Sequence, residues 1–259
     1  MQDLKLALFQ LDLKWEDKKA NLEKINQFID HTVEDDTNII VLPEMFTTAF
    51  SMNPKALAES MDGPSVEWMR NKAIEINKTI TGSLIIEENG NFFNRLIWMR
   101  PDGTFTSYDK RHLFSMAGEQ QHYTAGKQKL IVEAYGWKFC PLICYDLRFP
   151  VWLRNREEYD SLLIVANWPE RRIFHWDQLL VSRAIENQCY VVAVNRVGPD
   201  ANNISHNGSS TVVDPAGQVL LQIKGQEQVA HILLNKDKIA EVRKNMPFLA
   251  DRDDFEIFL

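Results

Sequence analysis

The chain has 259 residues, of which 45% are hydrophobic and 25% are charged, and its formal net charge is −7. This composition is ordinary for a globular protein with a large apolar core, and the acidic balance argues against nucleic acid as the main partner, because phosphate binding needs a concentrated basic surface. No apolar run approaches the roughly 18 residues of a membrane span, and the N-terminal segment lacks the uninterrupted apolar region of a signal peptide.

Apolar runs of strand length alternate with amphipathic stretches of helix length from the first residues onward. Residues 4–11 predict a buried strand, and apolar residues at helical spacing predict a helix from Glu16 to Val33. The segment "NIIVLPE" predicts a short second strand that Pro43 stops. A second helix is expected after the turn-like "DGP" at Asp62 to Pro64.

The middle of the chain is rich in strand and turn signals. Three apolar runs separated by "ENGN" and "PDG" predict hairpins over residues 79–110, and another pair surrounds Tyr135-Gly136. The runs "SLLIVANW" and "YVVAVNRV" predict strands on either side of a helix from Phe174 to Gln188, and "DPAGQ" predicts a last hairpin. Because no linker or repeat interrupts this pattern, we expect a single α/β domain over residues 1–259.

Two segments allow two interpretations each. In the helix "FHWDQLLVSRAIENQ", the apolar face could cover the chain's own sheet or meet a partner subunit. The C-terminal "LADRDDFEIFL" could be a frayed end or an arm that packs on a partner.

Three reactive side chains come directly after apolar strands. Glu44 follows "NIIVLP", Lys110 follows "TFTSYD" and Cys144 follows "CPLI". In α/β sheets the ligand crevice lies at the carboxyl ends of strands, so the shared placement predicts a site. Taken singly, Cys144 could be a packed apolar residue, an interpretation that suits Cys140 and Cys189.

The three residue types are chemically complementary. A thiol with a pKa near 8.5 is mostly protonated at neutral pH and needs a base or a cation beside it to attack. Glu44 could accept the thiol proton, while Lys110 and the backbone N–H of Tyr145 could stabilise the charge that develops on the attacked group. A carboxylate, an ammonium and a thiol therefore favour acyl-transfer chemistry.

The segments "LPEMF", "YDKRHLF" and "LICYDLRFP", in this order, resemble the Glu-Lys-Cys signature of the nitrilase superfamily of carbon-nitrogen hydrolases. Further segments, "NWP", "SRAIENQCYVVAVNRVG" and "GSSTVVDPAGQV", extend the resemblance over nearly the whole chain. It implies that Cys144 is the nucleophile, Glu44 the general base and Lys110 the transition-state stabiliser. Glu119 resembles a second glutamate that positions the substrate or assists proton transfer, although it could also be a surface loop residue.

The resemblance also implies a fold, a four-layer α-β-β-α sandwich of two stacked mixed sheets, that commonly doubles into a homodimer or higher homo-oligomer. It implies a small-molecule amide as substrate and no metal or organic cofactor. The scattered histidines and the absence of C-x-x-C spacing also argue against a metal site. The odd number of cysteines, three, argues against a disulfide framework and indicates a reducing cytoplasm.

The segments "CYDLRFPVWLRN", "VANWPERR" and "HYTAG" together most resemble the bacterial omega-amidase branch. Members of this branch hydrolyse the terminal amide of 2-oxo acids such as 2-oxoglutaramate and 2-oxosuccinamate. The far carboxylate of such a substrate suits an arginine fork. Arg171 and Arg172 are the candidates, unless they belong to a solvated loop, and Trp168 and Phe46 are the expected apolar walls. Another small amide, an N-carbamoyl compound or a nitrile remains open as substrate, and so does a non-catalytic binding role.

Overall fold

The computed structural model describes residues 3–258 and forms two facing sheets. The first sheet has six strands in the order β13-β1-β2-β3-β4-β5. Their bounds are β13 Gln228–Leu234, β1 Leu4–Gln10, β2 Ile39–Val41, β3 Thr79–Glu88, β4 Asn91–Met99 and β5 Phe105–Asp109. The sheet is mixed, because β1, β2 and β3 run parallel while the remaining pairs are antiparallel.

The second sheet has seven strands and is also mixed. Its order is β10-β11-β9-β8-β7-β6, and β12 pairs with β11. The bounds are β10 Val197–Pro199, β11 Ser205–Val213, β9 Tyr190–Asn195, β8 Ser161–Ala166, β7 Trp137–Ile143, β6 Val132–Ala134 and β12 Val219–Lys224. Strands β7, β8 and β9 are parallel, and their residues are buried almost throughout, as expected for strands covered on both faces.

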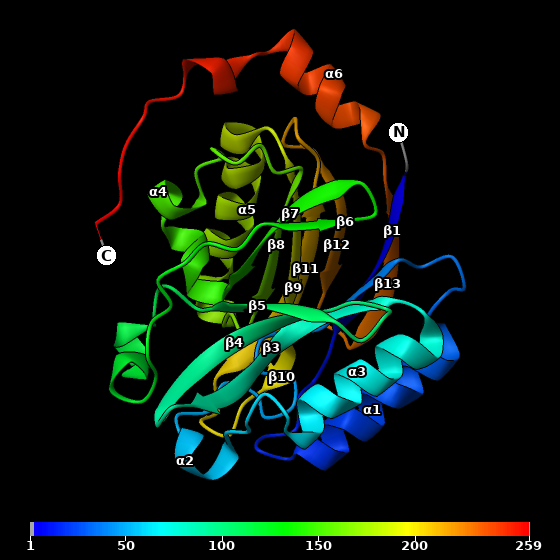
Figure 1. Ribbon diagram of the computed structural model, residues 1–259, viewed down its shortest axis with the longest axis vertical. Helices are drawn as coiled ribbons and strands as arrows, with labels where there is room; N and C mark the ends of the chain where they lie inside the picture. The colour runs from blue at the N-terminus through cyan, green and yellow to red at the C-terminus, as the bar shows by residue number, and fades with distance from the viewer. Residues whose placement is uncertain (1–2, 259) are drawn as a thin grey trace.

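The helices lie outside the two sheets. Their bounds are α1 Lys18–Thr32, α2 Pro54–Leu57, α3 Pro64–Ile76, α4 Pro150–Leu153, α5 Ile173–Asn187 and α6 Asp237–Asn245. The described part of the chain also contains five 3₁₀ turns: η1 Ser115–Ala117, η2 Glu119–Gln121, η3 Cys144–Arg148, η4 Glu170–Arg172 and η5 Phe248–Asp251. Figure 1 shows α1 and α3 side by side on one sheet and α5 against the other.

Two apolar layers explain this arrangement. Leu6, Val41 and Trp98 of the first sheet share a buried cluster with the strands of the second sheet, so the sheets pack face to face. A second cluster joins the opposite face of the first sheet to Ile25 of α1 and Met69 of α3. The outcome is the α-β-β-α sandwich that the sequence resemblance implied.

Local sequence signals account for several element ends. The side chain of Asp17 caps α1 by accepting the Ala20 N–H at 3.0 Å. Pro64 begins α3, as the "DGP" segment predicted. The hairpin between β3 and β4 turns at Asn89 and Gly90, both with positive φ, which is the geometry that Asn-Gly favours.

The two ambiguous segments both contact the chain itself. In α5, Trp176, Leu180 and Ala184 are fully buried in the cluster beneath the second sheet, so this face covers the chain's own sheet. The C-terminal segment runs back along the molecule, where Arg156 lies over the Phe255 ring at 5.0 Å. Phe258 near its end is 90% exposed.

Candidate functional site

The ends of strands from both sheets meet at one cavity. Glu44 follows β2 and Lys110 directly follows β5 in the first sheet, whereas Cys144 directly follows β7 in the second sheet. Lys110 and Cys144 line a cavity of about 570 Å³. Glu44 is fully buried behind it and accepts a hydrogen bond from the Lys110 ammonium at 2.9 Å. The structure thus brings together the three residues predicted from the strand ends.

Glu119 belongs to the same cluster and is not a surface residue. Its carboxylate is fully buried and accepts two hydrogen bonds from Lys110 Nζ, at 3.0 and 2.9 Å. The backbone N–H of Phe114 donates to Glu119 Oε2 at 2.5 Å. Lys110 is therefore held between two carboxylates, and the loop that carries Glu119 is fixed by the same contacts.

Two asparagines that the sequence reasoning did not single out complete the surroundings of Glu44. Asn94 of β4 donates to Glu44 Oε1 at 2.8 Å, and the backbone N–H of Asn167 donates to Oε2 at 2.8 Å. Asn167 directly follows β8, the same position that marked Glu44, Lys110 and Cys144, so its place after an apolar strand was the available signal. Asn94 is a polar residue inside the apolar run "FFNRLIWM", which signals a buried partner.

The backbone at Cys144 turns sharply to present its side chain. Cys144 has φ of +45°, a left-handed conformation that is uncommon for a residue with a side chain, and it begins the turn η3. A strained turn between a strand and a helical segment projects a nucleophile out of the sheet edge. The Tyr145 N–H is the first amide after Cys144, where a helical turn leaves amides without intrahelical partners.

The charges around Cys144 set its protonation. Burial raises the pKa of the Cys144 thiol, as does the negative charge of Glu44, while Lys110 and the Asn167 amide act in the opposite direction. Burial would lower the pKa of Lys110, but Glu119 and Glu44 more than offset it and the pKa is raised, so the ammonium stays charged. Burial and Glu44 raise the pKa of Glu119. The site therefore holds a protonated thiol close to a charged ammonium.

Four of the five predicted binding residues line the cavity, and one does not. Trp168, Tyr145, Arg171 and Arg172 all line the cavity. Phe46 does not: it is buried in the cluster under α3, with its ring 6.0 Å from that of Trp68. The chain reverses at Met45, which has positive φ, so Phe46 faces the helix layer.

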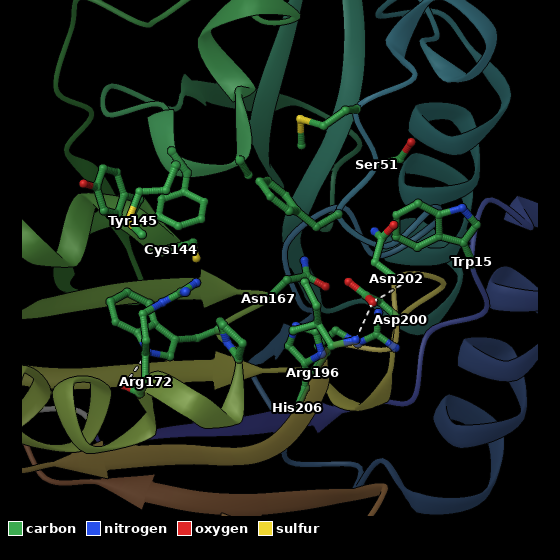
Figure 2. Close-up of a pocket in the computed structure, with 18 of the residues that line it drawn as sticks. Trp15, Ser51, Cys144, Tyr145, Asn167, Arg172, Arg196, Asp200, Asn202 and His206 are labelled. Carbon is green, nitrogen blue, oxygen red and sulfur yellow. Dashed lines mark hydrogen bonds between the residues drawn. The ribbon is translucent and has the colours of Figure 1, made fainter.

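Aromatic and cationic side chains surround the opening to Cys144. Phe50 supplies an apolar wall where Phe46 was expected, and its ring lies 5.0 Å from Lys110 Nζ. The Arg172 guanidinium lies over the Phe114 ring at 4.9 Å and extends toward Cys144 and Tyr145, as Figure 2 shows. Arg148, a cavity residue that the sequence reasoning missed, stacks on Trp168 at 4.6 Å. Arg172 is half-buried and forms no ion pair with any side chain that the structure describes. Arg171, its neighbour, is exposed.

Neither a metal cluster nor a membrane helix is found within residues 3–258. No three histidine, cysteine, aspartate or glutamate side chains gather in a way that could hold a metal ion. No helix in this range is long and apolar enough to cross a bilayer.

Comparisons with known proteins agree with this geometry. The carbon-nitrogen hydrolase family model matches residues 5–244. The chain is 43% identical to "Omega-amidase YafV" of Yersinia enterocolitica, over 98% of the chain and 99% of that protein. It is 32% identical to "2-oxoglutaramate amidase" of Bacillus subtilis, over 95% and 96% of the two chains.

A solved structure extends the likeness to the fold. XC1258 from Xanthomonas campestris, described as a CN-hydrolase superfamily protein with an arsenic adduct in the active site, matches with a TM-score of 0.96 and 42% identity. The match covers 100% of both chains. With strand ends, cavity and relatives in agreement, the chain belongs to the carbon-nitrogen hydrolase family.

Proposed function

We propose that this protein hydrolyses the terminal amide of 2-oxo dicarboxylic acid monoamides, such as 2-oxoglutaramate and 2-oxosuccinamate, to the 2-oxo acid and ammonia. The observation that carries the proposal is the position of Arg172. Its guanidinium extends into the cavity toward Cys144 and has no carboxylate partner among the described residues. An unpaired guanidinium beside an amide-hydrolysing cluster suits a substrate with an amide at one end and a carboxylate at the other. The names of the omega-amidase and 2-oxoglutaramate amidase relatives support the same substrate class.

The first half of the reaction forms a thioester. Glu44 takes the proton of the Cys144 thiol as the sulfur attacks the amide carbon, and the carbonyl oxygen becomes an oxyanion. Lys110 and the Tyr145 N–H stabilise that oxyanion: the Lys110 charge acts on the Cys144 thiol, and the Tyr145 N–H is the first amide after Cys144 in the turn η3. Glu44 then returns the proton to the amide nitrogen, the carbon-nitrogen bond breaks and ammonia leaves.

The second half releases the acid. Glu44 accepts a proton from water, whose oxygen attacks the thioester carbon, and the tetrahedral oxyanion again lies against Lys110 and the Tyr145 N–H. When the carbon-sulfur bond breaks, the thiolate leaves and recovers the proton from Glu44. Glu119 assists by holding Lys110, with which it makes two hydrogen bonds.

Intact-mass spectrometry of acid-quenched mixtures with 2-oxoglutaramate tests nucleophile and substrate together. We expect an acyl adduct on Cys144, which the Cys144→Ala variant does not form, together with release of ammonia. An adduct with only a different amide, an N-carbamoyl compound or a nitrile would keep the mechanism and reject the substrate class. A protein that forms no adduct and releases no ammonia with any member of such a panel would instead fit a non-catalytic binding role.

A further inference from the structure

The residues that must react together come from different sheets, so sheet hydrogen bonds do not fix their separation. Lys110 follows β5 of the first sheet, and Cys144 follows β7 of the second. A shift of one sheet over the other would move the ammonium relative to the sulfur, and a displacement of about 1 Å can cost a catalytic site roughly a hundredfold in rate. Some contact must therefore connect the two segments directly.

One buried carboxylate makes this connection. Asp146, two residues after Cys144, is fully buried, and its Oδ2 accepts the Ile143 N–H at 3.1 Å inside the Cys144 turn. The same oxygen accepts the Tyr108 hydroxyl at 2.8 Å. The other oxygen, Oδ1, accepts the His112 backbone N–H at 2.9 Å and lies 2.8 Å from His112 Nδ1.

The partners of this carboxylate flank Lys110 symmetrically. Tyr108 precedes Lys110 by two residues and His112 follows it by two, so both sides of the lysine are tied to the turn that carries the nucleophile. We propose that Asp146 is a positioning residue that sets the separation of Lys110 from Cys144 by binding both Tyr108 and His112. The inference rests on the proposed function only in taking Lys110 and Cys144 as the pair that reacts.

Neighbouring contacts keep these partners in place. The Trp152 indole N–H donates to the Tyr108 hydroxyl oxygen at 3.2 Å, which leaves the hydroxyl proton for Asp146. Burial and the Asp146 charge raise the pKa of Tyr108, so its hydroxyl remains a donor. The His112 ring stacks on Phe149 at 3.7 Å between centroids, with 6° between the planes. Phe149 directly follows η3, so the histidine is also fixed against the nucleophile's turn.

The network requires a carboxylate in particular. Both oxygens face backbone N–H donors, that of Ile143 at Oδ2 and that of His112 at Oδ1. In Asp146→Asn, the amide NH₂ would face one of these N–H groups in either orientation, and a buried donor would lose its acceptor. Tyr108→Phe is the milder change for Asp146, because both backbone donors to the carboxylate stay bound. It removes the hydroxyl contact to Asp146 and the acceptor of the Trp152 indole N–H and the Arg111 N–H.

The experiment measures kcat, KM and the rate at which iodoacetamide alkylates Cys144 at neutral pH, in Tyr108→Phe and Asp146→Asn. We expect kcat to fall roughly tenfold or more with KM within about twofold, because the pair is displaced while the cavity is kept. Alkylation should slow severalfold, because the thiolate loses the support of Lys110. Asn155→Ala is the matched control: Asn155 is fully buried and bonds Asn187 and Tyr159, outside the cavity lining.

The control separates positioning from stability. All variants are assayed well below their melting temperatures, where Asn155→Ala should keep kcat and the alkylation rate despite a lower Tm. The proposal is overturned if Tyr108→Phe keeps both values, or if Asn155→Ala lowers them as much. If Asp146→Asn does not fold, Tyr108→Phe alone decides the question. Because alkylation needs no substrate, rejection of the 2-oxo acid amides would leave this test intact.

Discussion

Glu44 and Asn167 follow strands of opposite sheets and are joined by hydrogen bonds from both the backbone and the side chain of Asn167. The Asn167 backbone N–H donates to Glu44 Oε2 at 2.8 Å, and its side-chain Nδ2 donates to the Glu44 backbone carbonyl at 2.7 Å. The first contact orients the carboxylate and the second fixes the chain that carries it. The orientation of the carboxylate therefore depends on contacts with the segment that follows β8, and not on its own side-chain rotamer alone.

We expect Asn167→Ala to lower kcat about tenfold, because loss of the Nδ2 contact loosens Glu44 although the backbone N–H remains. Steady-state kinetics with the amide that the wild type turns over would measure this. Asn155→Ala again serves as the control for a buried asparagine outside the cavity. An unchanged kcat in Asn167→Ala would show that the carboxylate is oriented sufficiently by Lys110 and Asn94.

Replacing Glu119 by Gln should reduce both stability and activity. Glu119 Oε2 accepts the Phe114 N–H and Lys110, and Oε1 accepts Lys110 and lies 3.4 Å from Asn94 Nδ2. The Gln NH₂ would face a donor in either orientation, at a cost of about 1–3 kcal/mol. Thermal unfolding and kcat would both report this. The exposed Glu133, changed to Gln, is the matched control and should alter neither.

The two neighbouring arginines should differ in their effect on substrate binding. Arg172→Gln should raise KM for a 2-oxo acid monoamide about tenfold or more, since a guanidinium bound to a carboxylate contributes roughly 1.5–3 kcal/mol. A neutral short-chain amide lacks that carboxylate, so its KM should change little. Arg171→Gln should have the smaller effect, because Arg171 is exposed at the cavity edge. Equal changes in KM for charged and neutral amides would argue against carboxylate binding by Arg172.

Much of the site followed from one local regularity in the sequence, a polar residue directly after an apolar strand. Cys144 and Lys110 were identified in this way, and Asn167 has the same placement after β8. What local patterns could not give is the pairing of residues across the two sheets, such as Asn167 with Glu44, because that depends on how the sheets face each other.

The position of Phe46 and the strand β13 were not predicted correctly from the sequence. Phe46 was predicted to be a cavity wall, but it lies in the turn after β2, where Met45 has positive φ, and it packs into the cluster under α3. Strand β13 was not predicted, although its sequence "QVAHILL" is largely apolar; its residues are mostly half-buried at the edge of the sheet. β13 pairs with β1 near the opposite end of the chain, and a pairing between residues so far apart leaves no local signal in the sequence.

His206 should make the stability of the protein depend on pH. Burial, together with the nearby Arg196 cation, lowers the pKa of His206 from 6.5 to about 4. In the unfolded chain the imidazole binds its proton near pH 6.5, whereas in the folded chain it stays neutral until about pH 4. The unfolded state therefore binds more protons between these values, and the free energy of unfolding should fall as pH falls through this window.

Urea unfolding of the wild type and His206→Gln at several pH values tests this. The wild type should lose on the order of 3 kcal/mol more than the variant between about pH 6.5 and pH 4, because each pKa unit corresponds to about 1.4 kcal/mol. Above pH 7 the imidazole is neutral in both states, so its titration should add no slope. His31 is exposed, and His31→Gln provides the control, which should follow the wild type throughout. Parallel curves for wild type and His206→Gln would contradict the assignment of this pH dependence to His206.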